Sequence, residues 1–68
     1  MELQTKFGKA VRQFRTASGL TIEALAQDAG ISYSYLGEIE RGMRNPSLAV
    51  IAALAGSLRV EPYRLLMD

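Results

Sequence analysis

The chain has 68 residues, a formal net charge of +1 and an apolar fraction of 49%. A chain of this length forms one domain at most, and it is too short for a Rossmann unit, a TIM barrel or an immunoglobulin sandwich. The absence of cysteine and histidine excludes disulfides, thiol catalysis, Cys-based zinc sites and the commonest general base near neutral pH. We therefore expect a small domain that is not an enzyme and needs no cofactor or metal.

The charge and hydropathy patterns bear on partners and location. A net charge of +1 is a weak basic surplus for a nucleic-acid binder, so an argument for DNA depends on where the charges lie. The first ten residues lack the apolar segment of a signal peptide. The longest uncharged stretch, from Asn45 to Leu58, is shorter than the ~20 residues of a membrane helix. These features predict a cytoplasmic protein.

The first half of the chain predicts two helices. Apolar residues recur at steps of three and four from Leu3 to Ala17, which indicates an amphipathic helix that ends at Ser18-Gly19. A shorter helix follows from Ile22 to Ala29. Thr21 is a suitable N-cap for it, and Gly30 ends it.

The second half predicts three more helices. One begins near Ser32 or Tyr33, with Ser32 as its expected N-cap, and ends at Arg41-Gly42. The pair Asn45-Pro46 is a start signal for a further helix that runs to about Leu58. A fifth, short helix is expected from Pro62 to Met67. No alternating pattern typical of strands is present, so the sequence predicts a compact all-α domain of five helices.

The segment from Thr21 to Arg41 has the features of a helix-turn-helix. A small side chain is needed where the two helices cross, and Ala26 supplies it. The turn needs a residue that adopts positive φ, and Gly30 supplies it. Apolar residues that lock the pair stand at the expected offsets: Leu25, Ala29, Ile31, Leu36 and Ile39.

This segment, with the Asn-Pro-Ser at 45–47, resembles the XRE-type helix-turn-helix family of phage repressors and Cro proteins. The likeness rests on the Thr21 start, the Gly30 turn and the Tyr-Leu-x-x-Ile-Glu-x-Gly pattern at 35–42. It implies a lambda-repressor-like domain, sequence-specific binding of double-stranded DNA and a homodimer on a two-fold operator. Small members include phage repressors, antitoxins and controller proteins of restriction–modification systems, and the sequence does not choose among them.

Two residues depart from the family pattern. Ile22 stands where the family often has a glutamine that reaches a phosphate and braces the recognition helix, so that side-chain contact is excluded here. Arg59 stands where the family often has a glycine after the fourth helix. A left-handed conformation at Arg59 would cost on the order of 1 kcal/mol.

The recognition helix is expected at about Ser32 to Arg41, in the major groove. Glu38 is suited to accept a hydrogen bond from cytosine N4, and Ser34 is suited to either base edge. The alternative is that this is only a solvated face. The predicted base contacts are Ser32, Tyr33, Ser34, Gly37 and Glu38, of which Tyr33 reaches either a base or only the sugar-phosphate backbone.

Phosphate contacts are expected around the recognition helix. Arg41 and Arg44 lie where the duplex backbone passes, and Asn45 and Ser47 lie at a predicted helix N-terminus, which favours anions. Gln27 projects outward from the preceding helix. Tyr35 either bonds a phosphate or packs inward beside Leu36, and the alternative for the loop arginines is solubility alone.

Two further expectations concern structure and assembly. The resemblance implies a partly buried ion pair between Arg15 and Glu40 that ties the first helix to the third. An apolar surplus at the end of the chain predicts a homodimer interface. Its residues are Tyr63, Leu65, Leu66 and Met67, and the alternative is that they cover the core of the monomer.

The leading hypothesis is therefore a sequence-specific DNA-binding transcriptional regulator. The alternative is a protein-interaction module, or an antitoxin-like partner, that uses the same fold. The weak net charge and Glu38 on the reading face favour this alternative slightly. Binding that weakens steeply with salt would distinguish DNA recognition from protein docking.

Overall fold

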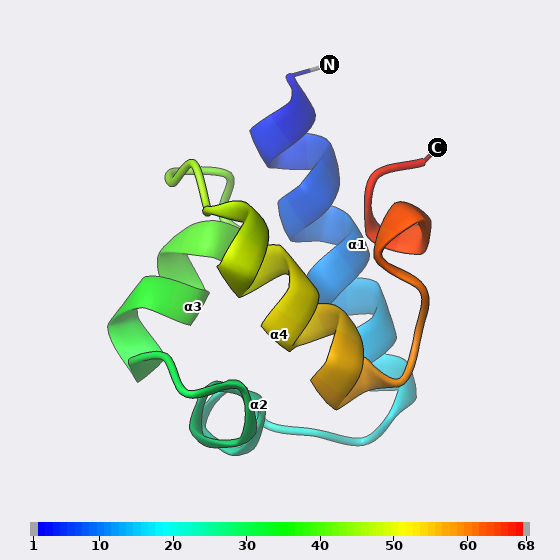
Figure 1. Cartoon of the computed structure of the whole chain (residues 1–68). Coiled ribbons are helices and arrows are strands. Elements are labelled where there is room, and N and C mark those ends of the chain that lie inside the picture. The colour runs from blue at the N-terminus through cyan, green and yellow to red at the C-terminus, as the bar shows by residue number, and fades with distance from the viewer. Residues whose placement is uncertain (1, 68) are drawn as a thin grey trace.

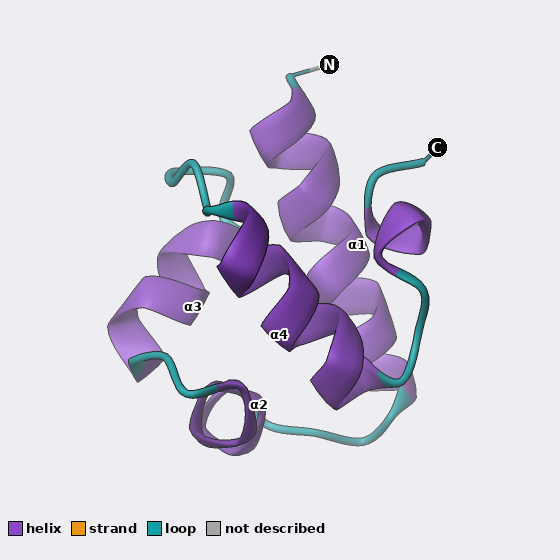
Figure 2. Ribbon diagram, viewed as in Figure 1, coloured by secondary structure: helices purple, strands orange, loops and turns teal. Residues whose placement is uncertain are grey.

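The computed structural model describes residues 2–67, which form four α-helices and one 3-10 helix (Figure 1). No strand occurs in this range (Figure 2). The expected five-helix architecture is therefore wrong in its count, because the last element is not an α-helix. The elements are α1 (Leu3–Ala17), α2 (Ile22–Ala29), α3 (Tyr33–Glu40), α4 (Leu48–Leu58) and the 3-10 helix η1 (Pro62–Leu65).

Three helices begin at hydroxyl caps. The Thr21 hydroxyl accepts a hydrogen bond from the Ala24 amide at 3.0 Å, and the Ser32 hydroxyl accepts one from the Tyr35 amide at 3.0 Å. Each bond satisfies an amide that lacks a partner inside its helix. The bounds of α1 and α2 and the cap of α3 agree with those that the sequence predicts.

The start of α4 differs from its prediction. Ser47 is the N-cap, and its hydroxyl accepts a hydrogen bond from the Val50 amide at 3.2 Å. The hydroxyl reaches the third amide of the helix, so the helix begins at Leu48. Asn45 and Pro46 therefore belong to the loop between α3 and α4, and the expectation that they start the helix is wrong.

The end of the chain also differs from its prediction. The expected helix from Pro62 to Met67 is a single 3-10 turn that ends at Leu65. Its bonds span three residues, from the Arg64 amide to the Glu61 carbonyl and from the Leu66 amide to the Tyr63 carbonyl. Such bonds have poorer geometry than those of an α-helix and rarely continue beyond one turn.

One apolar core holds the elements together. Helix α1 packs on α3, α2 packs on α3 and α4, and η1 packs on α1 and α4. Burial of these side chains is the main stabilising contribution, at ~25 cal/mol per Å² of apolar surface. The core residues are Phe7, Ala10, Val11, Leu25, Ala26, Leu36, Ile39, Leu54, Ala55, Leu58 and Leu65.

Helices α1 and α3 approach closely at Gly8. A Cβ atom at Gly8 would overlap the carbonyl oxygen of Ile39 and lie 2.9 Å from that of Glu40. The absence of a side chain therefore sets how near the end of α3 lies to α1. Sequence analysis did not identify Gly8, because a glycine inside a helical pattern gives no sign of what packs against it.

Candidate nucleic-acid interface

Helices α2 and α3 form the predicted helix-turn-helix. Figure 1 shows α2 nearly end-on and α3 across the view, so the two helices meet at a steep angle. Gly30 makes the turn with φ 77° and ψ 29° in the left-handed region, where glycine is unstrained. The Ile31 amide donates to the Ala26 carbonyl at 3.0 Å and closes the end of α2. Ala26 is buried between the helices.

The N-terminal part of α3 is the exposed part. Ser32, Tyr33 and Ser34 are all exposed, whereas Leu36 and Ile39 are fully buried in the core. The hydroxyl of Ser32 accepts from the Tyr35 amide, and its hydrogen stays available to donate elsewhere. The core thus fixes one side of α3 and leaves three polar side chains on the other.

Gly37 does not lie on the exposed face that the sequence predicts. It is buried, because the Arg41 side chain lies over it; a Cβ atom at Gly37 would lie 3.3 Å from Arg41 Nη1. A base edge reaches this glycine only after Arg41 has moved. The prediction gave Gly37 and Arg41 separate DNA contacts. The two residues are four positions apart, however, and residues at this spacing on a helix are neighbours.

Glu38 is paired with an arginine. Its Oε1 lies 3.0 Å from Arg44 Nε in an ion pair, and the Arg44 guanidinium carbon lies 5.0 Å from the centre of the Tyr35 ring. Tyr35 is half-buried, so its ring packs on the helix while it supports a cation. The sequence predicts separate DNA contacts for Glu38 and Arg44, and for Tyr35 either a phosphate contact or inward packing. Nothing in the spacing of Glu38 and Arg44 indicated the pair, because Arg44 lies outside α3.

The remaining predicted phosphate contacts surround α3. Arg41 ends α3, and among residues 2–67 it takes part in no ion pair. Asn45 and Ser47 are exposed in the loop before α4, where the first amides of α4 lack helical partners. Gln27 is exposed on α2.

A second ion pair lies on the inner side of α3. Arg15 donates from Nε to Glu40 Oε2 at 2.6 Å and from Nη2 to Glu40 Oε1 at 3.0 Å. Its Nη1 donates to the Leu20 carbonyl at 2.8 Å. The hydrogen bond to Glu40 raises the pKa of Arg15, so the guanidinium stays charged. Arg15 thus connects α1 both to α3, through Glu40, and to the loop that precedes α2, through Leu20. Nothing in the sequence indicated the Leu20 contact.

A protein family described as helix-turn-helix, HTH_3, matches residues 11–65. The chain belongs to this helix-turn-helix family. The uncharacterized HTH-type transcriptional regulator YazB of Bacillus subtilis is 48% identical over 59 residues, which cover 87% of this chain and 86% of YazB. By contrast, this chain spans 36% of the length of the Bacillus subtilis regulator SlrR.

Two solved structures of the family are similar throughout. The restriction-modification controller protein C.AhdI from Aeromonas hydrophila has a TM-score of 0.89 and 48% identity, covering 91% of this chain and 94% of that chain. The biofilm regulator SinR in complex with DNA has a TM-score of 0.86 and 34% identity, covering 90% and 98%. The resemblance that the sequence indicated is therefore confirmed.

The C-terminal segment of this helix-turn-helix protein divides between core and surface. Leu65 is fully buried, so the expectation that it lies in a dimer interface is wrong; it covers the core of the monomer instead. Tyr63 and Met67 are exposed, at 61% and 52%. Leu66 is half-buried. The hydrophobicity of these residues is similar, and only the turn of η1 decides which one points inward.

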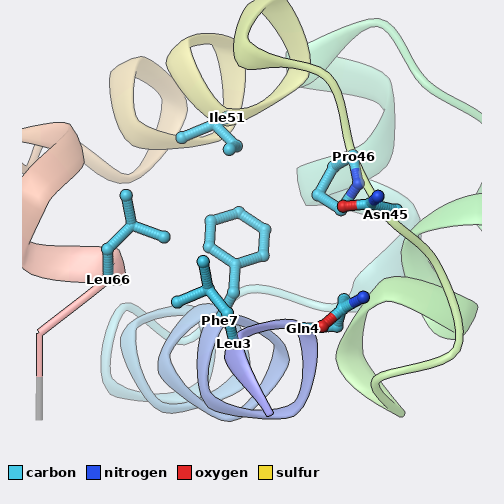
Figure 3. A pocket seen from close by; sticks show the side chains of 7 residues that line it. All are labelled: Leu3, Gln4, Phe7, Asn45, Pro46, Ile51 and Leu66. Atoms are coloured by element: carbon cyan, nitrogen blue, oxygen red, sulfur yellow. The ribbon is translucent and has the colours of Figure 1, made fainter.

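An apolar pocket opens beside Leu66 (Figure 3). It has a volume of about 210 Å³ and lies between the start of α1, the loop before α4, α4 and the C-terminal segment. In Figure 3 Leu66 and Ile51 face Phe7 and Leu3 across it. The lining residues are uncharged: Leu3, Gln4, Phe7, Asn45, Pro46, Ile51 and Leu66.

No helix within residues 2–67 has both the length and the hydropathy needed to cross a membrane. Histidine, cysteine, aspartate and glutamate form no group of three or more there that could hold a metal ion.

Proposed function

We propose that this helix-turn-helix protein, a DNA-binding transcriptional regulator, reads an operator by placing α3 in the major groove of double-stranded DNA. The observation that carries this proposal is the division of α3 into two sides. Leu36 and Ile39 are locked in the core, while Ser32, Tyr33 and Ser34 project from its N-terminal end. Recognition helices of this class contact base edges with their N-terminal residues. We place this activity in the cytoplasm, as the sequence predicts.

The charges around α3 support the proposal in spite of the weak net charge. Glu40 is paired with Arg15, and Glu38 is paired with Arg44. Both carboxylates of α3 are therefore neutralised locally, and Arg41 is left as an unpaired cation within residues 2–67. The first amides of α4 offer a further site for a phosphate. A net charge of +1 thus does not describe the potential at this surface.

Selection of bound sequences from a random DNA pool, followed by a salt titration, tests this function. We expect a shared motif, with affinity that falls steeply as salt rises because bound phosphates release counterions. In the variant Ser34→Ala, preference should change at one or two base pairs. A flat salt response, or no enriched motif, would contradict DNA recognition and favour the protein-interaction alternative.

We also propose a homodimer through the apolar surface around the pocket. Leu48 at the start of α4 is 83% exposed, and Leu3 and Met67 are more than half exposed. Leu3 and half-buried Leu66 line the uncharged pocket, and we propose that Leu48 and Met67, which lie near lining residues in the chain, extend it into one apolar patch. Exposed apolar patches of this kind mark interaction sites. A second copy fits, since two copies related by a two-fold axis present two recognition helices to two half-sites.

Analytical ultracentrifugation and operator binding test the dimer. The variant Leu48→Glu places a charge in the patch and should shift the protein toward monomer. Binding to a two-half-site operator should then fall more than binding to a single half-site. Ala17→Glu is the matched control, because Ala17 is exposed at the far end of α1. An unchanged dimer in Leu48→Glu would place the interface elsewhere.

A further inference from the structure

The outer side of α3 carries the Arg44–Glu38 ion pair. Separate contacts of these two residues with a phosphate and a base would not require them to pair with each other. Arg44 stands on the loop after α3, yet its side chain returns to that helix. Its Nε lies 3.0 Å from Glu38 Oε1 in an ion pair, and its guanidinium lies over the Tyr35 ring at 5.0 Å. Two residues one helical turn apart thus hold one arginine. Arg44 therefore already has two partners within the protein.

The Arg44–Glu38 pair is accessible to solvent, so Arg44 can exchange Glu38 for another anionic partner. The Arg44 side chain is 53% exposed and that of Glu38 is 36% exposed. Exposed ion pairs are weak in water, because solvent screens them and two flexible side chains must be ordered. A guanine edge or phosphate at the right position can therefore replace the carboxylate as the partner of Arg44. An anion held at a poor distance or angle cannot.

Resting on the proposed function, we propose that Glu38 is a specificity-determining residue that acts through Arg44. On unrelated DNA the protein has no fixed register, and Arg44 keeps its ion pair with Glu38. That arginine then neutralises no phosphate and adds little to affinity. On the operator the register is fixed by the other contacts, and Arg44 exchanges Glu38 for a DNA group. Glu38 thus suppresses non-specific binding.

This role differs from the acceptor role that the sequence suggests for Glu38. A carboxylate that accepts from cytosine N4 would have to leave Arg44 and face the major groove. The bond to Arg44 instead directs the carboxylate toward the loop. Arg44 Nε and Glu38 Oε1 lie 3.0 Å apart as an ion pair, while about half of the Arg44 side chain stays exposed and accessible to DNA. The face of the Tyr35 ring also attracts the guanidinium, whose carbon lies 5.0 Å from the ring centre.

A double-mutant cycle tests the proposal. Wild type, Glu38→Gln, Arg44→Gln and the double variant are titrated with the selected operator and with an unrelated duplex of equal length. We expect Glu38→Gln to tighten binding to the unrelated duplex about fivefold and to raise its salt slope by about one. Operator affinity should change less, so specificity falls. In the Arg44→Gln background the effect of Glu38→Gln should disappear.

Glu61→Gln is the matched control, since it removes the same charge from an exposed residue outside the helix-turn-helix. Circular dichroism of each variant checks folding. Equal tightening on both duplexes, or an effect that persists without Arg44, would overturn the proposal. A changed preference at one base pair in Glu38→Gln would show direct base contact and overturn it too. Wild-type protein that bound no duplex would overturn the proposed function as well, whereas operator binding with no coupling would overturn this proposal alone.

Discussion

Helix α3 carries two glutamates, and each is paired with an arginine in a different environment. Glu38 and Glu40 lie two residues apart, which turns them by about 200° around the helix axis. The Arg15–Glu40 pair is nearly buried, with side-chain exposures of 12% and 5%. The Arg44–Glu38 pair is open, with exposures of 53% and 36%. The same two side-chain types therefore meet on the inner and the outer side of one helix.

The difference between the two pairs shows that burial, more than residue type, decides what an ion pair does. Arg15 makes two bonds to Glu40 and a third to the Leu20 carbonyl, so it has little freedom to find another partner. Removing one member would leave a charge away from water. Arg44 is held by an exposed ion pair with Glu38 and has ready access to solvent. The inner pair fixes α3 in place, and the outer pair is free to respond to DNA.

The largest effect is expected from a substitution at Gly8, where α1 lies against the backbone of α3. In Gly8→Ala the new methyl group would overlap the Ile39 carbonyl oxygen and force α1 and α3 apart. The atoms that the methyl group would meet belong to the backbone of Ile39 and Glu40, so they cannot move aside as a flexible side chain would. We expect a loss of about 4 kcal/mol or more in the free energy of unfolding, measured by urea denaturation.

Gly56→Ala is the control for this variant. Gly56 lies inside α4, and nothing stands within 4 Å of the position that its Cβ would occupy. There the change should raise the free energy of unfolding by roughly 0.5–1 kcal/mol, because alanine is the better helix former. A stable Gly8→Ala variant would contradict the close approach of α1 and α3.

The second effect compares the two glutamates directly. Glu40→Gln keeps the shape of the side chain but leaves Arg15 without a counter-charge, and should cost about 3 kcal/mol of unfolding free energy. Glu38→Gln removes the same charge at an exposed pair and should cost less than about 0.5 kcal/mol. Thermal unfolding of both variants provides the measurement. Equal losses would show that burial does not separate the two pairs.

A third, smaller effect concerns DNA affinity and compares Arg44, which is paired with Glu38, with Arg41, which is unpaired within residues 2–67. Arg41→Ala should weaken binding to operator and to unrelated DNA alike, by about tenfold, and lower the salt slope by about one. Arg44→Ala should weaken operator binding more than binding to unrelated DNA, because Glu38 holds Arg44 in the latter case. Fluorescence anisotropy at several salt concentrations measures both. Parallel losses in the two variants would mean that Arg44 is a simple phosphate contact.

The sequence was sufficient for elements whose signals are local. Hydroxyl caps, glycine stops and helical periodicity predicted α1 and α2 at their observed bounds and the cap of α3. Contacts between distant segments had no such signal. The Arg44–Glu38 pair, the Gly8 approach and the burial of Leu65 all depend on how the loop and η1 return to the core. The prediction failed for η1 and for the start of α4, where Ser47 and not Asn45 is the N-cap.

The smallest effect concerns a residue that the sequence did identify. Arg59 ends α4 with φ 59° and ψ 43°, in the left-handed region that is costly for a side chain. In the part of the chain that the structure describes, its exposed side chain makes no bond that would offset this cost. Arg59→Gly should therefore raise the unfolding free energy by up to about 1 kcal/mol.

Gly30→Ala is the mirror-image control, since Gly30 has φ 77° with open space around it. It should lower stability by a similar amount. A loss of stability in Arg59→Gly, measured by the same urea titration, would show that the arginine side chain contributes more than its backbone strain costs.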